Sequence, residues 1–190
     1  MEKKKGTLPV FKVVFLLAGL IAIVVAGLSA IGPARTEVER SIYINGKAQD
    51  LYAFLLDFKN YHQWQPAIEL DSGLTSRIEG PMGEGGRYFW SGNELVGSGN
   101  LEIAKADPFR LVEMRMVYTE PWDVQATYQF RLSQEKNGTK ITWRYEAKNA
   151  YFSRISLLFM NMDKLLGAEL EKGLERMREV YQDSQNEKTQ

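Results

Sequence analysis

The sequence predicts an α+β fold, in which an antiparallel sheet packs against a long C-terminal helix, with one transmembrane helix before it. Three patterns support this prediction: an apolar run over residues 13–31, alternating segments separated by turns in the middle of the chain, and an amphipathic stretch from about Ser153. They divide the chain into a basic N-terminal segment (1–12), the transmembrane helix (13–31), a linker (32–35), one domain (36–182) and a polar tail (183–190).

The apolar run from Val13 to Ile31 is long enough to cross a bilayer. At about 1.5 Å per helical residue it spans roughly the 30 Å of a hydrocarbon core. Lysines precede it at positions 3, 4, 5 and 12, and they outweigh the basic residues that follow nearby, which are Arg35, Arg40 and Lys47. This asymmetry predicts a single-pass membrane protein with a cytoplasmic N-terminus and an extracytoplasmic domain.

Two alternatives compete with the uncleaved anchor. A cleaved secretory signal has a shorter apolar part that ends in a small-x-small site, and Gly27 with Ser29 forms a tolerable cleavage pair. A buried core helix is the other alternative, but a helix that is apolar on every side needs a larger protein around it. The sequence favours the anchor, and cleavage stays open.

The domain begins with a strand and a helical pattern. After Gly32-Pro33 ends the first helix, residues 36–44 alternate in polarity, which is typical of a half-buried strand. After Asn45-Gly46, apolar residues recur at helical spacings until Pro66 stops the helix. These residues are Leu51, Phe54, Leu55, Phe58, Tyr61 and Trp64.

From Ile68 onward, regularly spaced turn residues predict an antiparallel meander of about six strands. Two strands show an apolar face clearly, and Asn137-Gly138 between them predicts a hairpin. Asn137-Gly138-Thr139 is also a glycosylation acceptor pattern, although a tight turn explains the same residues. The apolar faces consist of Val124, Ala126, Tyr128, Phe130 and Leu132 in the first strand and Ile141, Trp143 and Tyr145 in the second.

The final segment, from about Ser153 to Tyr181, has one broad apolar stripe and predicts a long amphipathic helix. The stripe runs through Ile155, Leu158, Phe159, Met162, Leu165, Leu166, Leu170, Leu174, Met177 and Tyr181. The order of a strand, short helices, about six strands and a long helix is the pattern of the helix-grip fold.

Composition excludes several functional classes. The chain has 24 basic and 24 acidic residues and no long basic run, which argues against a nucleic-acid partner. It has no cysteine, so disulfides, thiolate catalysis and cysteine-held metals are excluded. With His62 as the single histidine, a histidine-rich metal site is excluded too, and we expect neither a metal nor a cofactor.

Several motifs together resemble the polyketide cyclase/dehydrase-like branch of the SRPBCC, or START-like, superfamily. The resemblance covers residues 38–181 and is carried by WQP at 64–66, GPMGEGGRYFWSGN at 80–93, VGSGNLEI at 96–103, NGTKITW at 137–143, MNMDKLLG at 160–167 and EKGL at 171–174. It implies a curved antiparallel sheet wrapped around the C-terminal helix, with a cavity between them that receives a hydrophobic small molecule.

Such a cavity would be lined by large apolar residues on the inward faces of the sheet and helix. The expected lining residues are Trp90, Met114, Met116, Tyr128, Phe130, Trp143 and Tyr145 from the sheet and Phe159, Met162 and Leu166 from the helix. Methionine and aromatic side chains suit varied apolar ligands because they adapt their shape and make few polar demands. The same residues could instead simply fill the core.

We find no catalytic constellation. As a histidine, His62 could serve as a general base, but its place at the end of a short helix is typical of a surface or capping residue. Glycines 83, 85 and 86 lack the lysine and serine of a phosphate-binding loop, and a turn explains them. Four charged residues are candidates to reach the cavity, although each suits a solvated surface better: Arg77, Glu94, Arg115 and Asp163.

The sequence therefore favours a membrane-anchored, non-enzymatic domain that binds a hydrophobic small molecule or lipid. One alternative is an enzyme of the cyclase or dehydratase kind, which would fold a flexible substrate and move a proton. Another is a protein-interaction or envelope-stress accessory domain whose cavity is filled by side chains. The identity of any protein partner is not predicted.

Overall fold

The computed structural model describes residues 10–121 and 123–187. The lysines at positions 3, 4 and 5, on which the predicted orientation partly depends, lie outside the described residues. The chain forms two compact units. The first contains the chain up to Ala34 together with Asn149–Asn161, and the second contains Arg35–Lys148 and the chain from Met162 onward.

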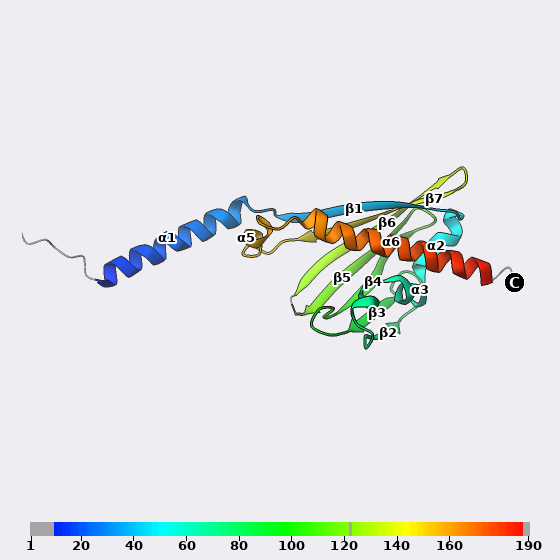
Figure 1. Ribbon diagram of the computed structural model, residues 1–190, viewed down its shortest axis with the longest axis horizontal. Coiled ribbons are helices and arrows are strands. Elements are labelled where there is room, and N and C mark those ends of the chain that lie inside the picture. Colours follow the sequence, from blue (N-terminus) through cyan, green and yellow to red (C-terminus); the bar gives the residue numbers. More distant parts are fainter. Residues whose placement is uncertain (1–9, 122, 188–190) are drawn as a thin grey trace, which may run out of the picture. The chain divides into compact units, whose positions relative to one another are not determined.

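The second unit is built on one seven-stranded antiparallel sheet with the strand order β1-β7-β6-β5-β4-β3-β2. Strands β2 to β7 follow one another as a meander, and β1 pairs with β7. The sheet curves beside the long helix α6, which confirms the predicted fold class (Figure 1). The strands are β1 Arg35–Ile44, β2 Thr75–Glu79, β3 Arg87–Ser91, β4 Ser98–Asp107, β5 Leu111–Glu120, β6 Val124–Glu135 and β7 Gly138–Lys148.

Three short helices connect β1 to β2, where the sequence predicts one helix that ends at Pro66. They are α2 Ala48–Leu56, α3 Phe58–Trp64 and α4 Ala67–Leu70. The break lies at Asp57, whose backbone is extended and whose carboxylate accepts a hydrogen bond from the Lys59 backbone N–H at 2.9 Å. Such a cap starts a new helix because it satisfies a backbone N–H that lacks an intrahelical acceptor.

The predicted hairpin joins β6 to β7, with its turn one residue earlier than expected. Glu135 pairs with Gly138, so the turn residues are Lys136 and Asn137. A Cβ atom on Gly138 would lie 2.4 Å from the carbonyl oxygen of Ile44. Glycine therefore serves here as the first residue of β7, where the backbone of the end of β1 comes too close for a side chain.

Helix α6 spans Met162–Glu187 and does not begin near Ser153, so the prediction of one continuous helix is wrong at its start. A separate turn of helix, α5 Arg154–Leu157, precedes it. Asn161 is a preferred type of N-cap residue and Asp163 places a negative charge in the first turn, which together favour a helix start here. Leu158 and Phe159 consequently lie outside both helices and carry exposed side chains.

The core of the second unit lies between the sheet and α6 and is closed by α2 and α3. Its largest fully buried side chains include Leu51, Leu55, Phe130, Ile141, Leu174 and Tyr181. A Cβ atom on Gly173 would lie 2.6 Å from Cζ3 of Trp143. Helix α6 thus approaches the sheet more closely at Gly173 than a side chain would permit.

A polar clamp holds the beginning of α6 to the edge strand β1. The Arg40 guanidinium donates to Asp163 at 2.9 Å and to Glu171 at 2.6 Å. The hydrogen bond from Arg40 lowers the pKa of the Asp163 carboxyl below its usual value. The clamp is therefore charged and formed at neutral pH.

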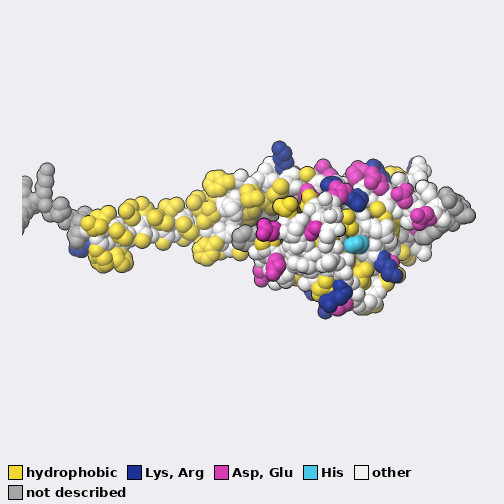
Figure 2. All heavy atoms as spheres, turned by 60° about the horizontal axis from the view of Figure 1, so that its bottom comes forward, with side chains coloured by type: hydrophobic (Ala, Val, Ile, Leu, Met, Phe, Trp, Pro, Cys, Tyr) yellow, Lys and Arg dark blue, Asp and Glu magenta, His cyan; other side chains and the backbone are white. Residues whose placement is uncertain are grey.

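The first unit contains the apolar helix α1, Val10–Ile31, and the short helix α5. Apolar side chains cover α1 and are exposed along it, as Figure 2 shows in yellow. A core helix would have these side chains buried, so that alternative is wrong. With 22 residues, α1 has the length and composition of a membrane span or a signal sequence.

Candidate ligand-binding pocket

A pocket of about 240 Å³ lies between the sheet and α6 in the second unit. Its walls come from strands β3, β5, β6 and β7, from helices α3, α4 and α6, and from the loop between β3 and β4. The lining residues are Tyr61, Gln65, Pro66, Ala67, Leu70, Trp90, Leu95, Val96, Met116, Tyr118, Tyr128, Trp143, Tyr145, Leu166, Glu169 and Leu170. Side chains therefore leave part of the space between sheet and helix unfilled.

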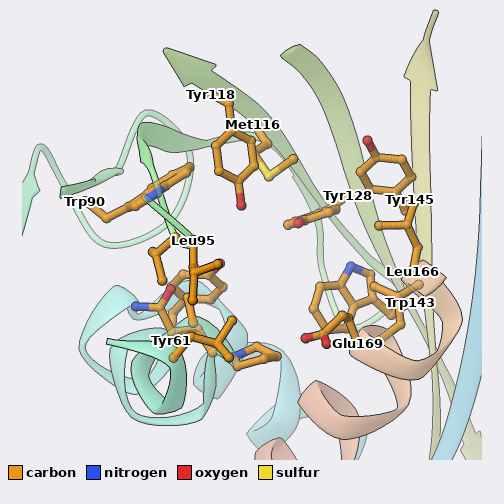
Figure 3. A pocket seen from close by; sticks show the side chains of 16 residues that line it. Tyr61, Trp90, Leu95, Met116, Tyr118, Tyr128, Trp143, Tyr145, Leu166 and Glu169 are labelled. Carbon is orange, nitrogen blue, oxygen red and sulfur yellow. The ribbon is translucent and has the colours of Figure 1, made fainter. Parts of the chain in front are cut away.

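Aromatic rings form most of the wall on the sheet side (Figure 3). Strand alternation places Met116 and Tyr118 on one face of β5, and Trp143 and Tyr145 on one face of β7. The rings support one another by edge-to-face contacts, with centroids 5.1 Å apart for Trp90 with Tyr118 and 5.1 Å apart for Tyr128 with Trp143. Edge-to-face packing keeps rings in defined positions, so this wall is preorganised.

Three residues of the lining are exposed to solvent. Leu95, in the loop between β3 and β4, is 81% exposed, and Leu70, at the end of α4, is also exposed. Glu169 of α6 is the third. The exposed part of the lining thus combines apolar side chains with one charged group.

One buried donor in the pocket has no partner. Trp143 is 3% exposed, and its Nε1–H makes no hydrogen bond to any residue that the structure describes. In Figure 3 this nitrogen faces the pocket, on the side of Tyr128. An unpaired buried donor costs free energy, so the site is suited to an acceptor atom that completes the hydrogen bond.

Three tyrosine hydroxyls add further donors. Figure 3 shows the hydroxyls of Tyr118 and Tyr128 directed into the pocket. Burial raises the pKa of Tyr61 and of Tyr128, and burial together with the nearby Glu169 charge raises the pKa of Tyr118. These phenols are therefore neutral in the physiological range, where each can donate one hydrogen bond.

His62 belongs to a hydrogen-bond network behind the pocket and does not line it. Its Nδ1 is 2.8 Å from the Tyr88 hydroxyl, which also accepts a hydrogen bond from Gln65 Nε2 at 2.5 Å. Tyr88 is fully buried, and Gln65 is a lining residue. The network fixes the orientation of Gln65. His62 is half-buried and hydrogen-bonded within it, whereas the sequence favoured a surface or capping histidine.

The structure brings six of the ten expected lining residues together around the pocket: Trp90, Met116, Tyr128, Trp143, Tyr145 and Leu166. Their role in binding stays a prediction. The other four do not line it. Met114 and Phe130 are fully buried, one inward-facing position farther along their strands than Met116 and Tyr128.

The other two expected lining residues, Met162 and Phe159, do not line the pocket because of where α6 begins. Met162 is the first residue of the helix, one turn before Leu166, and it is half-buried outside the lining. Phe159 precedes α6, belongs to the first unit, and is 81% exposed. Because the helix begins at Met162, the helical spacing that predicted an inward-facing Phe159 does not extend to it.

The sequence interpretation missed several polar residues of the pocket, above all Tyr61, Gln65, Tyr118 and Glu169. Two of them carried a usable signal. Tyr118 is two residues after Met116 and therefore shares its face of β5. Glu169 is three residues after Leu166 and shares its face of α6.

The charged residues that the sequence analysis considered as candidates to reach the cavity do not line the pocket. Arg77 pairs with Glu79, Arg115 pairs with Glu102, and Asp163 pairs with Arg40. Glu94 is exposed in the loop between β3 and β4, and glycines 83, 85 and 86 form a turn. Among the described residues, no group of three or more acidic or histidine side chains is placed to hold a metal ion.

Residues 35–182 match the family model described as polyketide cyclase/dehydrase and lipid transport. No curated protein sequence is similar to this chain.

Solved structures with the same fold are numerous but distant in sequence. The di-domain ARO/CYC protein StfQ from the steffimycin biosynthetic pathway aligns with a TM-score of 0.60 and 10% identity, over 80% of this chain and 52% of StfQ. A Thalictrum flavum norcoclaurine synthase point mutant, in complex with a transition-state analogue, aligns with a TM-score of 0.57 and 11% identity, over 80% and 96%. A Staphylococcus aureus protein of unknown function aligns with a TM-score of 0.56 and 16% identity, over 83% and 99%. At these identities the likeness shows the fold alone.

Proposed function

The chain belongs to the polyketide cyclase/dehydrase and lipid transport family, and from this premise we propose that it is a membrane-anchored protein that binds a hydrophobic small molecule or lipid in the pocket beside α6. The unpaired Nε1–H of Trp143, buried in an otherwise mostly aromatic and aliphatic wall, carries this proposal. The Nε1–H of Trp64, fully buried outside the lining, is unpaired as well. The Trp143 donor differs because its residue lines a pocket, where the acceptor atom of a ligand can reach it.

The dimensions and polarity of the pocket restrict which ligands fit it. Its volume of about 240 Å³ is slightly below the usual range for small-molecule sites, which begins at about 300 Å³. The ligand is therefore compact, or inserts one end while the remainder leaves between Leu70 and Leu95. That end carries a neutral acceptor, such as a carbonyl or ether oxygen, because the inner polar groups are the donors of Trp143, Tyr118 and Tyr128.

Native mass spectrometry of the full chain, extracted from membranes, tests the binding. We expect a co-purifying lipid or small molecule, and uptake of a fluorescent fatty acid methyl ester, whose ester carbonyl is a neutral acceptor, by protein from which the lipid has been removed. The variant Ala67→Trp places a large ring at the pocket wall and should abolish uptake. Met82→Trp, at an exposed position away from the lining, is the matched control and should bind normally. Equal uptake by both variants, or none by the parent chain, contradicts the proposal.

The variant Trp143→Phe tests the donor itself. It removes the indole N–H and keeps an aromatic ring in the wall. A net hydrogen-bond contribution of about 0.5–1.5 kcal/mol corresponds to roughly two- to tenfold weaker binding. Fluorescence titration should show this loss for a carbonyl-bearing ligand and little change for a hydrocarbon probe of the same length. A loss of the same size for both would assign the effect to packing.

A cyclase or dehydratase-like activity is the second candidate, and Glu169 favours it. Its carboxylate faces the same space as the hydroxyls of Tyr118 and Tyr128, so one ionisable group and two neutral donors surround a bound substrate (Figure 3). A carboxylate can move a proton while phenols hold a carbonyl oxygen. Incubation with a poly-β-ketone analogue should yield loss of water that Glu169→Gln abolishes. Unchanged analogue supports binding alone.

We further propose that α1 is an uncleaved single-pass anchor and that the domain is extracytoplasmic. Lys12, three residues into α1, and the preceding lysines support this orientation. Alkaline phosphatase fused after Gln190 should be active in a bacterial host, and the fusion should stay in the membrane fraction at full length. An inactive fusion contradicts the orientation, and a shortened soluble product contradicts the anchor.

A further inference from the structure

Residues 149–161, which we call the 149–161 segment, expose an unusual amount of apolar surface. Phe152 is 74% exposed and Phe159 is 81% exposed, and Tyr151, Leu158 and Met160 are exposed as well. Large exposed apolar patches mark contact with a membrane or a partner. We therefore expect the aromatic and aliphatic side chains of this short segment to contact a membrane or a partner.

The 149–161 segment packs against the C-terminal part of α1 within the first unit (Figure 1). The Tyr151 hydroxyl donates to the carbonyl oxygen of Ala26 at 2.7 Å, and Asn149 Nδ2 donates to the carbonyl oxygen of Pro33 at 2.9 Å. A Cβ atom on Gly32 would lie 2.6 Å from the carbonyl oxygen of Arg154. The contact is therefore close and specific.

The pattern of burial on α1 agrees with this docking. Along α1 and the residue that follows it, Val25 and Leu28 are half-buried, and Ser29 and Gly32 are buried. Their spacing of three and four places them on one face of a helix. The 149–161 segment thus covers one face of the last two turns of α1, while the remainder of the helix stays exposed.

The contact with α1 determines how far the 149–161 segment lies from the C-terminal end of that helix, and hence how deep it would lie in a bilayer. Ala26 lies five residues before Ile31, the last residue of α1, which corresponds to roughly 8 Å along a helix axis. Interfacial helices and their side chains enter a bilayer by about 5–10 Å. If α1 crosses the membrane, Tyr151 lies at the depth where aromatic belts are found.

We propose that the 149–161 segment is a bilayer-interface element, which inserts Phe152 and Phe159 into the lipid beside the end of α1. The proposal rests on α1 being a membrane anchor, as proposed above. It adds a second membrane contact, made by a part of the chain more than a hundred residues later in the sequence. It also explains why the segment is apolar although it lies outside the core.

The polar groups of the segment fit this location. Ser153 Oγ donates to the carbonyl oxygen of Ala150 at 2.8 Å, and Ser156 Oγ donates to that of Ser153 at 2.7 Å. Hydroxyls that are paired in this way cost less to place at a lipid boundary. Arg154 is the one charged residue of the segment, and its guanidinium lies 5.6 Å from the centre of the Tyr151 ring. A single positive charge suits anionic lipid headgroups.

Site-directed spin labelling of the full chain tests the proposal, since the protein has no cysteine of its own. Single variants Phe152→Cys and Phe159→Cys are labelled and reconstituted into bilayers of zwitterionic and anionic phosphatidyl lipids. Leu20→Cys, in the middle of α1, reports the anchor. Met82→Cys, an exposed apolar position in the second unit, is the matched control. Relaxation by oxygen and by a water-soluble nickel complex then gives the depth of each label.

We expect the labels at 152 and 159 to collide more with oxygen than with nickel, at a depth of about 5–10 Å. The label at 20 should be deepest, and the label at 82 should be fully accessible to nickel. A deep label at 20 with aqueous labels at 152 and 159 overturns this inference and leaves the anchor intact. An aqueous label at 20 overturns the anchor itself. Labels at 152 and 159 that are shielded from both reagents would mean that protein covers the segment, which also overturns the inference.

Discussion

The two ends of the space between the sheet and α6 are built from the same elements but differ in filling. At one end, Phe130 and Ile141 of the sheet meet Leu174 of α6, and all three are fully buried. At the other end, Tyr118 and Tyr145 of the sheet and Leu166 of α6 line the pocket, and all three keep some exposure. Moving along the same strands and the same helix therefore changes a packed core into an open pocket.

This difference shows that one layer of structure can be close-packed in one part and leave a pocket in another. Close packing contributes stability where the helix lies directly on the sheet, as it does at Gly173 over Trp143. At the pocket end, rings of neighbouring strands contact one another edge to face, and Arg40 links β1 to the beginning of α6.

The largest expected effect is at the packed end. Leu174→Ala should lower the free energy of unfolding by about 2–5 kcal/mol, because it removes buried contacts and leaves a cavity. Leu166→Ala, the same change on the same helix at the pocket wall, should cost only about 1 kcal/mol. Urea unfolding in detergent, followed by tryptophan fluorescence, measures both. Equal costs would mean that the two ends are packed alike.

The next effect concerns the junction of the two ends. Gly173→Ala should cost about 1–3 kcal/mol, since its Cβ atom would press on the Trp143 ring. The Trp143 ring forms part of the pocket wall, so the same variant should also weaken ligand binding. Combining it with Trp143→Phe, which removes the contacted atom, should recover part of the loss. Additive costs in this double-mutant cycle would contradict a direct contact.

The smallest effect is the pH dependence of the Arg40 clamp at the open end. Arg40 lowers the pKa of Asp163, so the clamp contributes stability above the ordinary carboxyl pKa and loses it as the pH falls through the lowered value. Hydrogen-exchange protection of the first turns of α6 should therefore fall in acid, before that of the turns around Met177. Asp163→Asn should reduce this difference. Loss of protection in both halves together would place the acid sensitivity elsewhere.

The alternation of single strands was enough to predict which side chains face inward. Tyr128, Trp143 and Tyr145 point to the helix side because successive residues of a strand alternate between faces. The same rule placed Met114 and Phe130 on that face correctly, yet it assigned them to the cavity. Periodicity specifies a face and contains no information on how far along the strand the neighbouring helix is in contact.

Helix boundaries are the second feature that the sequence pattern did not predict correctly. The apolar stripe from Ile155 to Tyr181 suggested one helix, whereas the chain forms α5, a break, and α6 from Met162. Asn161 and Asp163 carry a signal for that start, which the sequence interpretation did not use. The expected lining residue Phe159 is exposed because it precedes this boundary.

By itself, the sequence determined the order of the elements, their inward faces, the family, and the presence of one apolar N-terminal helix, because each depends on local composition and spacing. Only the tertiary structure decided where the sheet and helix separate, which donors meet at Trp143, Tyr118 and Tyr128, and that the 149–161 segment joins the end of α1. Those features depend on contacts between residues far apart in the chain, and a local pattern does not specify such contacts.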